Sequence, residues 1–544
     1  RRDPSARLSW HPIVTWHPIA NAPRPPARSM MLVMFALGLC AQPGLATRYV
    51  TTTGSDAAND CSNSGTPCAT IQAAVDEATA GEDIRVAEGT YSGSFVVTVN
   101  RLSTDYDYKQ VVFIDKALTV QGGYHVTDWT TSNPDLYITE ISAEADGRPV
   151  TVVDTLDGLV VLDGLLLTDG DYTGLGNPTG FVNHVCRSGG DEDCGGGLYV
   201  YNSAFHLLNS EVRGNVASTV AGDGGGIYLW DARQSTIEST RVADNGSPYG
   251  GGGIYVTQQD LPLTIRETTF LGNTSGYGGG VNLATNISAL VRVQDCELIE
   301  NTAVDGKGGG LYARLSANGM VLEMERVVVD DNKAWEQGKG VYLDAAGSFT
   351  PEASLVNVLF SKNIEVDGAP TAPEDAVLAV APQFTSLMAT LAHVTAGPNQ
   401  APTFLYAKPD TNPGRTVQVT AANVLLSGFQ NGFAGEEVGD GEATIEHTNT
   451  LLFNVMNQHL TVAGTPTFTS VDPVIGNPLV DVDNRLQVGS AAIDTGVDVG
   501  ILDDIDGDTR PYGAGFDIGA DEYSVLFVDG FESGDTTAWS SQSP

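Results

Sequence analysis

Three basic residues, Lys307, Arg314 and Lys339, fall at short intervals in the middle of the sequence, with acidic residues such as Asp305 and Asp331 beside them. A base beside a cation can abstract the proton next to a carboxylate group while the cation neutralises that carboxylate. These five residues are therefore the candidates for lyase chemistry, whereas a hydrolase would need two carboxylates at a defined separation. Their local pattern fits solvated loop charges equally well, so both interpretations stay open.

A second group is the run Asp504-Ile505-Asp506-Gly507-Asp508, which places three carboxylates at alternate positions around a glycine. Hard oxygen ligands at this spacing suit Ca²⁺. The glutamate that ends an EF-hand loop at its twelfth position is missing, because Gly515 stands there. We expect that the protein requires no cofactor, and that Asp504, Asp506 and Asp508 either bind Ca²⁺ or form an acidic turn without metal.

Cysteines form two closely spaced pairs, Cys61 with Cys68 and Cys186 with Cys194. In an oxidising compartment such spacing predicts two local disulfides. Cys296 lies at an apparent strand position and is expected to be a buried free thiol. No histidine or further cysteine pair falls at the spacing of a zinc site.

The N-terminal region predicts export. Two arginines precede an apolar run from Met30 to Leu39, and Gly44-Leu45-Ala46 offers a cleavage site between small residues. We interpret residues 30–46 as a signal peptide and residues 1–29, which lack an initiator Met, as an upstream or artefactual segment. The apolar run is too short for a bilayer-spanning helix, so we expect no membrane-spanning segment in the mature chain and an extracellular or bacterial cell-surface location.

Composition and net charge limit the classes of partner that the protein can bind. The 544 residues include 27 Lys and Arg against 67 Asp and Glu, a formal net charge of −40. Such a chain is repelled by nucleic acids and by anionic membranes, so we expect no nucleic-acid partner. The 63 glycines indicate many tight turns and few long helices.

Two markers repeat in step between residues 186 and 363. A Gly-rich turn followed by an apolar residue recurs every 27 to 30 residues, with central glycines Gly196, Gly225, Gly252, Gly279 and Gly309. An asparagine three residues after an apolar residue recurs every 28 to 31 residues, at Asn215, Asn245, Asn273, Asn301, Asn332 and Asn363. A shared period of this length indicates a solenoid or a propeller.

The segments between the markers read as strands. Leu263-Thr264-Ile265-Arg266 and Val291-Arg292-Val293-Gln294 alternate between apolar and polar residues. The Gly and Asn positions are interpreted as turns with positive φ. Several short strands per repeat with no helix between them favour an all-β parallel β-helix, in which each strand pairs with its copy one coil away. Propeller blades are usually longer than this repeat.

The repeats resemble a known class. Gly-Gly-Gly followed by Ile, Leu or Val, together with Phe270-Leu271-Gly272-Asn273 and Phe360-Ser361-Lys362-Asn363, is similar to the repeats of polymorphic outer-membrane proteins. Those belong to the wider pectin-lyase-like class, so the resemblance implies a single-stranded right-handed parallel β-helix. Because that class contains polysaccharide lyases and hydrolases, it also implies the enzymatic alternative for the five residues above.

The ends of the solenoid are predicted separately. Within residues 47–100, a cap and first coil, the stretch Ala69–Ala80 is expected to form a short amphipathic helix that Thr70 caps and Gly81 ends. The parallel β-helix is predicted over residues 101–489.

Residues 490–523 resemble the choice-of-anchor domain of bacterial surface proteins, Q type. The shared elements are Ala492-Ile493-Asp494-Thr495-Gly496, Asp506-Gly507-Asp508-Thr509-Arg510-Pro511 and Asp517-Ile518-Gly519-Ala520-Asp521-Glu522. The resemblance implies an envelope or secreted protein in which this segment closes the β-helix as a C-terminal cap. Residues 524–544 are interpreted as a tail with an attachment role.

Two functional hypotheses follow. The leading one is a secreted or cell-surface β-helix protein, monomeric, that binds extracellular glycans or surface proteins as an adhesin or structural element without an active site. The alternative is an extracellular polysaccharide lyase or glycoside hydrolase. The tyrosines that follow the Gly-rich turns either pack coil on coil or face outward as a carbohydrate platform: Tyr199, Tyr228, Tyr255, Tyr312 and Tyr342.

Overall fold

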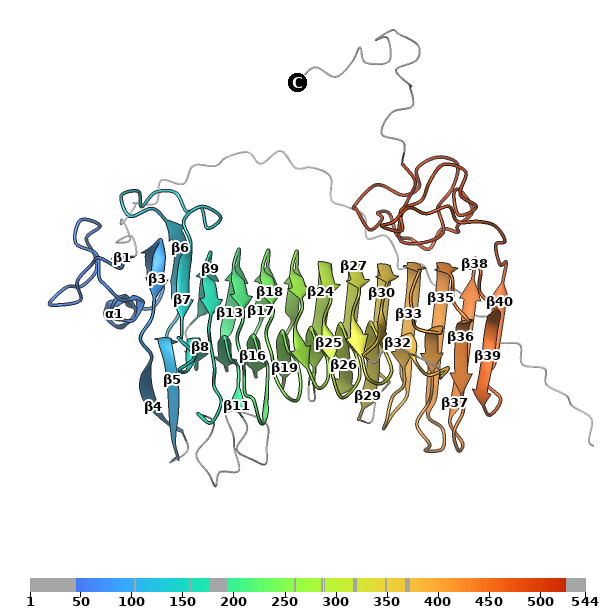
Figure 1. Cartoon of the computed structure of the whole chain (residues 1–544), viewed down its shortest axis with the longest axis horizontal. Coiled ribbons are helices and arrows are strands. Elements are labelled where there is room, and N and C mark those ends of the chain that lie inside the picture. Colours follow the sequence, from blue (N-terminus) through green and yellow to red (C-terminus); the bar gives the residue numbers. More distant parts are fainter. Residues whose placement is uncertain are drawn as a thin grey trace, which may run out of the picture. The chain divides into compact units, whose positions relative to one another are not determined.

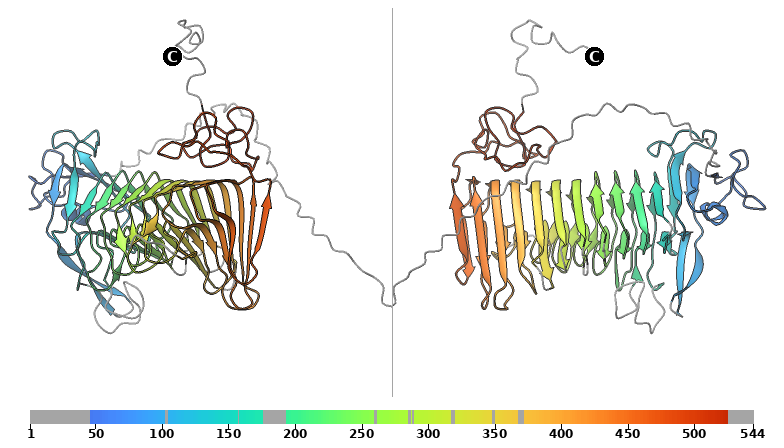
Figure 2. Two further views of the ribbon diagram at one scale, coloured as in Figure 1. Left: turned by 45° about the vertical axis from the view of Figure 1, so that its right-hand side comes forward. Right: turned by 180° about the vertical axis from the view of Figure 1, so that it is seen from behind.

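The computed structural model describes residues 46–524 except 102–103, 157, 176–192, 259–260, 285–286, 288, 317–319, 348–349 and 367–371. The predicted signal peptide up to residue 45, the N-terminal segment and the tail beyond Ser524 lie outside the described residues. The described chain forms strands β1 to β40 and one helix, α1. Its strands stack coil on coil, as Figures 1 and 2 show.

Strands of successive coils align into long sheets. Sheet 1 has 21 strands: β1 (Thr47–Val50), β2 (Asp83–Ala87), β3 (Gly89–Tyr91), β6 (Thr119–Tyr124), β7 (Thr139–Ser142), β9 (Leu159–Asp163), β10 (Leu166–Thr168), β13 (Ala204–Leu208), β14 (Glu211–Arg213), β17 (Ser235–Glu238), β18 (Arg241–Ala243), β20 (Leu263–Arg266), β21 (Thr269–Leu271), β24 (Leu290–Ile299), β27 (Val321–Asp330), β30 (Glu352–Ser361), β33 (Leu387–Ala396), β35 (Thr416–Ser427), β37 (Glu442–Thr448), β38 (Leu451–Phe453) and β40 (Thr467–Val471). Sheet 2 has 13 strands: β4 (Phe95–Arg101), β5 (Thr104–Ile114), β8 (Arg148–Val153), β12 (Leu198–Tyr201), β16 (Ile227–Trp230), β19 (Ile254–Thr257), β23 (Val281–Leu283), β26 (Leu311–Ser316), β29 (Val341–Ala346), β32 (Ala376–Val380), β34 (Thr403–Ala407), β36 (Asn431–Glu436) and β39 (Asn457–Ala463). Two small sheets join β22 (Thr274–Ser275), β25 (Thr302–Ala303), β28 (Lys333–Ala334) and β31 (Ile364–Glu365), and β11 (Asp193–Cys194) with β15 (Gly222–Asp223).

Each strand pairs in parallel with its copy one coil further along the chain. Tyr199 lies opposite Tyr228, and Tyr228 lies opposite Tyr255, without a shift in register. The hairpin of β4 and β5 is antiparallel. Because the pairing is parallel and no helix lies between consecutive strands of the described residues after β2, the predicted parallel β-helix is confirmed.

The core runs along the inside of the coils without interruption. Inward residues from Val50 in the first coil to Ile445 near the last belong to one buried apolar cluster. In β12 the residues Leu198 and Val200 enter this core, while Tyr199 between them points to the outer face of sheet 2. Alternation along short strands therefore builds the core, as the sequence pattern predicted.

The repeated asparagines form a buried ladder instead of positive-φ turns. Asn245 donates from its side-chain amide to Oδ1 of Asn273 at 3.0 Å, and Asn273 does the same to Asn301 at 2.9 Å. Positive φ occurs one residue earlier, for example at Asp244 and Glu300. The sequence interpretation of these Asn residues was therefore wrong, since their amides satisfy the buried backbone of the corner.

The Gly-rich turns also differ in detail from the prediction. The first glycine of each turn has positive φ, as Gly224 and Gly251 show, whereas the central glycines do not. A Cβ atom at central Gly225 would lie 2.5 Å from the carbonyl oxygen of Gly246. The central positions therefore require glycine because neighbouring coils approach closely, and only the first position requires it for its backbone conformation.

Besides the corner that carries the Asn ladder, each coil has a second corner, which lies within sheet 1. Asp295 in β24 has a φ of 53°, and this left-handed residue lets one strand turn around the corner. Equivalent corner residues in later coils include Asn357, His393, Asn423 and Asn449. Asn and Asp tolerate this conformation better than most side chains do.

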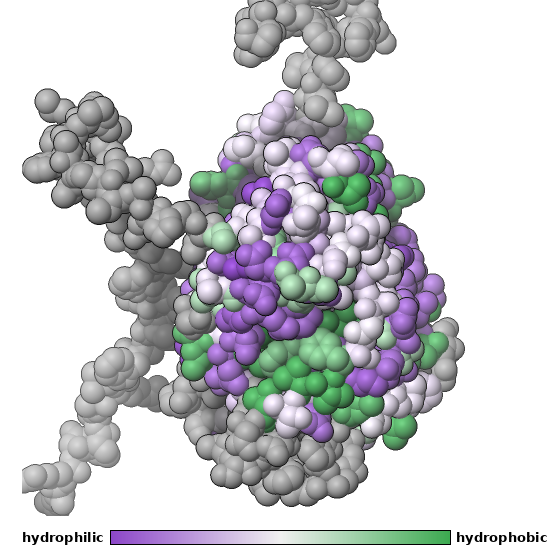
Figure 3. All heavy atoms as spheres, turned by 90° about the vertical axis from the view of Figure 1, so that its left-hand side faces the viewer, coloured by the Kyte–Doolittle hydropathy of each residue, from purple (hydrophilic) through white to green (hydrophobic). Residues whose placement is uncertain are grey.

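The N-terminal end is held by α1 (Ile71–Glu77), the one helix of the described residues. Thr70 caps it by accepting a hydrogen bond from the amide of Ala73, and Ile71, Ala74 and Val75 are buried, as predicted. The helix ends at Glu77, before the predicted stop, because Ala78 already has extended backbone angles. Apolar side chains gather on the lower part of this end of the molecule, at the level of β4 and β5 (Figure 3).

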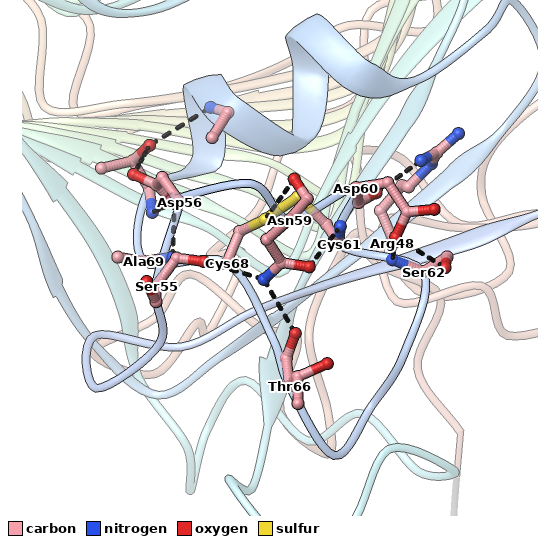
Figure 4. The surroundings of a disulfide bond; sticks show 12 residues. Arg48, Ser55, Asp56, Asn59, Asp60, Cys61, Ser62, Thr66, Cys68 and Ala69 are labelled. Carbon is pink, nitrogen blue, oxygen red and sulfur yellow. Dashed lines mark hydrogen bonds between the residues drawn. A yellow bond between two sulfur atoms is a disulfide. The ribbon is translucent and has the colours of Figure 1, made fainter.

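A disulfide fixes the loop before the helix. Cys61 and Cys68 are bonded, which confirms the first predicted pair (Figure 4). In the same loop, the Asp56 carboxylate accepts hydrogen bonds from the amides of Ala69 and Thr70, so the loop also ties down the start of α1.

The remaining cysteines are only partly described. Cys296 is free and buried, as predicted. Cys194 is buried, but Cys186 lies outside the described residues, so the second pair stays a prediction.

The C-terminal module, residues 476–524, packs along the side of the last coils rather than across the open end of the core (Figure 1). Asn357, Asn423 and Asn449 at the sheet 1 corner each donate to a backbone carbonyl of the module. Strands β39 and β40 at the end of the stack remain largely exposed. The segment 490–523 predicted to close the β-helix therefore attaches to its flank.

Candidate functional site

A cluster of polar and aromatic side chains covers the outer face of sheet 2 in its later coils. The alternation that sends Leu311 and Val341 into the core turns Tyr312 and Tyr342 outward. Their rings stack with centroids 5.5 Å apart and planes 2° apart. These two tyrosines are among the residues that the sequence singled out.

The earlier tyrosines form the same kind of stack. Tyr199 and Tyr228 stack at 5.8 Å, and Tyr228 and Tyr255 at 5.3 Å. All three are buried although they point away from the core, because the β4–β5 hairpin and other side chains pack over them. For these three residues the packing interpretation is confirmed, and a carbohydrate platform is not formed by them.

Lys307 and Arg314 both reach the tyrosine pair. The Lys307 ammonium donates to the Tyr342 hydroxyl at 2.9 Å and lies 4.4 Å from the centre of that ring. Arg314 Nε lies 3.5 Å from Oδ2 of Asp344, and its guanidinium lies over the ring of Phe384. Burial lowers the pKa of Lys307, while the carboxylates of Glu336 and Asp344 oppose that shift.

Asp344 is the buried centre of the cluster. Its Oδ1 accepts hydrogen bonds from the amides of Ala345 and Gln383, and its Oδ2 accepts one from the Tyr312 hydroxyl at 3.1 Å. Burial raises the pKa of Asp344 above that of an ordinary aspartate, and burial also raises the pKa of Tyr312. With its oxygens committed to these donors, Asp344 holds the site together and is poorly placed to accept a proton from a substrate.

The other three catalytic candidates lie apart from this cluster. Lys339 is fully buried, and its ammonium donates to the carbonyls of Ala334 and Glu336 and pairs with Glu365. Asp305 is exposed in the turn before Lys307. Asp331 lies at the Asn-ladder corner with a φ of 49°, on the far side of β28 from the Gly-rich turn.

The cluster continues past the repeats that the sequence revealed. Tyr342 lies opposite Ala379, which in turn lies opposite Tyr406, so Tyr406 occupies the same position two strands later. Its hydroxyl donates to Glu436, and Lys408 pairs with Glu436 at 2.9 Å. The sequence did not indicate these residues because no Gly-rich turn precedes them; only the apolar alternation around Tyr406 marks the strand.

The acidic run of the C-terminal module is arranged differently from a metal loop. Carboxylate oxygens of Asp504, Asp506 and Asp521 lie within 4.8 Å of one another, so Asp521 takes the place predicted for Asp508. The Arg485 guanidinium lies 2.7 Å from Asp506 and 3.8 Å from Asp521. A cationic group of the chain therefore already neutralises this cluster, and Ca²⁺ binding there stays a prediction that calorimetry with and without Ca²⁺ can test.

Asp504 itself serves the module as a turn former. Its Oδ1 accepts the amides of Asp506 and Asp508, and its Oδ2 accepts the amide of Glu522. Arg510 and Glu522 form a fully buried ion pair at 2.9 Å. The residues that carry the choice-of-anchor resemblance thus bind one another and give the module its shape.

The match to a protein-family model agrees with this architecture. A family model described as "Right handed beta helix region" matches residues 181–363. Among solved structures, the crystal structure of pectate lyase Pel9A is similar with a TM-score of 0.35 and 12% identity, over 88% of this chain and 98% of that chain. No curated protein matches the sequence. The stacked coils and the family model together show a right-handed parallel β-helix.

Proposed function

We propose that the chain is a secreted or cell-surface β-helix protein that binds or supports other extracellular components and catalyses no reaction. The observation that carries this proposal is that the charged groups of the sheet 2 cluster contact one another and the neighbouring tyrosines. Asp344 and Lys307 are hydrogen-bonded to tyrosine hydroxyls of the chain, and Arg314 is ion-paired with Asp344, so a proton-abstracting base and a free carboxylate-binding cation do not converge on one point.

Export and surface attachment are part of the same proposal. The predicted signal peptide over residues 30–46, the Cys61–Cys68 disulfide and the net charge of −40 all suit a protein outside the cell. The resemblance of residues 490–523 to a choice-of-anchor domain supports a bacterial envelope location. In the described residues, helix α1 falls well short of a bilayer-crossing segment in length and hydropathy.

The experiment that tests the proposal is an assay for unsaturated and reducing-end products. The exported protein is incubated with pectate, alginate and neutral polysaccharides, with and without Ca²⁺, and we expect no product. Turnover that is lost in both Lys307→Ala and Arg314→Ala would overturn the proposal in favour of a polysaccharide lyase. Fractionation of producing cells tests the location separately, and a cytoplasmic pool of unprocessed protein would contradict export.

A further inference from the structure

We propose that an exposed row of aromatic side chains, Tyr249, Tyr277 and Trp335, binds an extended, uncharged polysaccharide along the axis of the coils. This inference rests on the proposed binding function and names its ligand class. The row lies in the turns that lead into sheet 2, beside the cluster described above.

Backbone pairing places Tyr249 and Tyr277 in consecutive coils and Trp335 two coils further on. The amide of Tyr277 donates to the carbonyl of Tyr249 at 2.7 Å, so these two residues are one coil apart. In the next coil Gly306 leaves room for the Tyr277 ring, because a Cβ atom there would lie 2.5 Å from Cε1 of that ring. The amide of Trp335 then donates to the carbonyl of Ala303 in the coil that Tyr277 overlies. The three residues therefore lie in the same turn of the coil within a span of four coils, and the third of these coils contributes no aromatic residue.

All three rings are presented to solvent, and that of Tyr277 is held in place by a neighbouring ring. Tyr249, Tyr277 and Trp335 are 41%, 42% and 47% exposed, whereas the stacked ladder tyrosines Tyr228 and Tyr342 are 1% exposed. Tyr277 also packs edge-on against Tyr312, with centroids 5.8 Å apart and planes at 71°. Rigid aromatic rings that keep a free surface are efficient contact groups, since they lose little conformational freedom on binding.

The spacing and the polar surroundings indicate a sugar chain. Adjacent coils lie about 4.8 Å apart, which is comparable to the length of one pyranose unit in an extended chain. The apolar faces of pyranose rings stack on aromatic rings, and their hydroxyl groups need hydrogen-bond partners at the rim. Asp305 and Glu336 supply exposed carboxylates beside the row, and Lys307 is ion-paired with Glu336 at 3.7 Å.

Charge favours an uncharged glycan over a polyuronate. The exposed carboxylates of Asp305 and Glu336 flank the row, and Lys307 is engaged by Tyr342 and Glu336. The chain as a whole carries a net charge of −40. A polymer with one carboxylate per sugar would be repelled both locally and at long range.

Titration calorimetry with cellohexaose, xylohexaose and chitohexaose as probes tests the inference. We expect the wild-type protein to bind at least one of them and polygalacturonate not at all. Tyr277→Ala and Trp335→Ala should each weaken binding about tenfold, the size of one aromatic contact, while Tyr277→Phe keeps the ring and retains binding. Tyr512→Ala is the matched control, because Tyr512 is 41% exposed but belongs to the C-terminal module.

The outcomes separate this inference from the proposed function. Failure of the wild-type protein to bind all three hexasaccharides overturns the aromatic row and leaves a non-catalytic surface role intact. Binding that persists unchanged in Tyr277→Ala and Trp335→Ala, with an unaltered melting temperature, also overturns it. Cleavage of a probe that is lost in Trp335→Ala supports the row as a binding site and overturns the non-catalytic role.

Discussion

At the scale of single residues, the side-chain amides of the Asn ladder supply the hydrogen bonds of a fully buried corner. Asn301 donates to the carbonyl of Phe270 and to Oδ1 of Asn332, and its own Oδ1 accepts from both nitrogens of Asn273. The side chain of Asn301 is fully buried. Each amide thus links its own coil to the coils before and after it.

Replacing one asparagine of the ladder should therefore lower the stability of the fold. Asn301→Ala leaves the donors of Asn273 without their acceptor in a buried site, and we expect a loss of about 3 kcal/mol in the free energy of unfolding. Urea titration followed by circular dichroism measures this loss. Asn412→Ala is the control, because Asn412 is exposed and the one described partner of its side chain is Asp410. Equal midpoints for the two variants would contradict a structural role of the ladder.

The same residues show what sequence could and could not reveal. The period of Asn301 and its copies correctly indicated a stack of coils. Their role was misjudged because an Asn in a left-handed turn and an Asn with a buried amide look identical in a sequence. The residue that does have positive φ varies between coils, being Asp244 in one, Gly272 in the next and Glu300 in the one after, so it leaves no repeating letter.

At the scale of elements, the last coil contains a pair of histidines in its interior. His447 in β37 and His459 in β39 face each other with their Nε2 atoms 2.8 Å apart. His447 stacks on Phe433, His459 stacks on Phe468, and the hydroxyl of Thr450 lies 3.0 Å from Nδ1 of His447. One proton suffices for the bond between the two rings, so the folded coil favours neutral imidazoles.

This arrangement predicts that the end of the stack loosens in acid. Burial lowers the pKa of His447 to about 4 and also lowers that of His459, whereas an unfolded histidine titrates near 6.5. The stabilisation is therefore complete above pH 6.5 and is lost as the pH falls from 6.5 towards 4. Hydrogen exchange, corrected for intrinsic rates, should show β37, β39 and β40 opening more at about pH 5 than at pH 7, and His447→Gln should reduce this difference.

The histidine-free coils of β24, β27 and β30 provide the internal reference for that measurement. They should keep the same protection at both pH values. If the last coil also keeps its protection in acid, the pair of histidines does not control the stability of this end.

Prediction from sequence was uneven for the elements as well. Helix α1 could be located because Thr70, the apolar spacing and Gly81 are local signals, and only its end was misplaced. Strands β32 and β34 could not be assigned to the tyrosine-bearing face, since their turns lack the glycines that mark the other coils. The site at Asp344 was only partly foreseen for the same reason: Lys307 and Arg314 lie near a marked turn, whereas Tyr406 and Glu436 do not.

At the scale of the whole molecule, the C-terminal module binds the left-handed corner residues of sheet 1 in the later coils. Corner residues in the earlier coils, such as Asn209, Ser239 and Glu267, have the same left-handed conformation, but the side-chain hydrogen bonds that the structure describes for them go to other residues of the coils. The module also covers Leu359 and Leu425 with apolar residues of its own. This placement rests on contacts between residues 46 to 177 positions apart, which local patterns do not encode.

The Asn423 side chain is the sharpest probe of this docking. It donates to the Val497 carbonyl at 2.7 Å and accepts from the Val497 amide at 2.9 Å, and its own backbone has a φ of 54°. Asn423→Gly keeps that backbone conformation available and removes both bonds, a loss of about 2 kcal/mol, so exchange of the amides of residues 490–524 should rise about thirtyfold. Asn209→Gly, at the equivalent corner of an earlier coil, should leave these amides unchanged. A similar response in both variants would mean that the module is held by its apolar contacts alone.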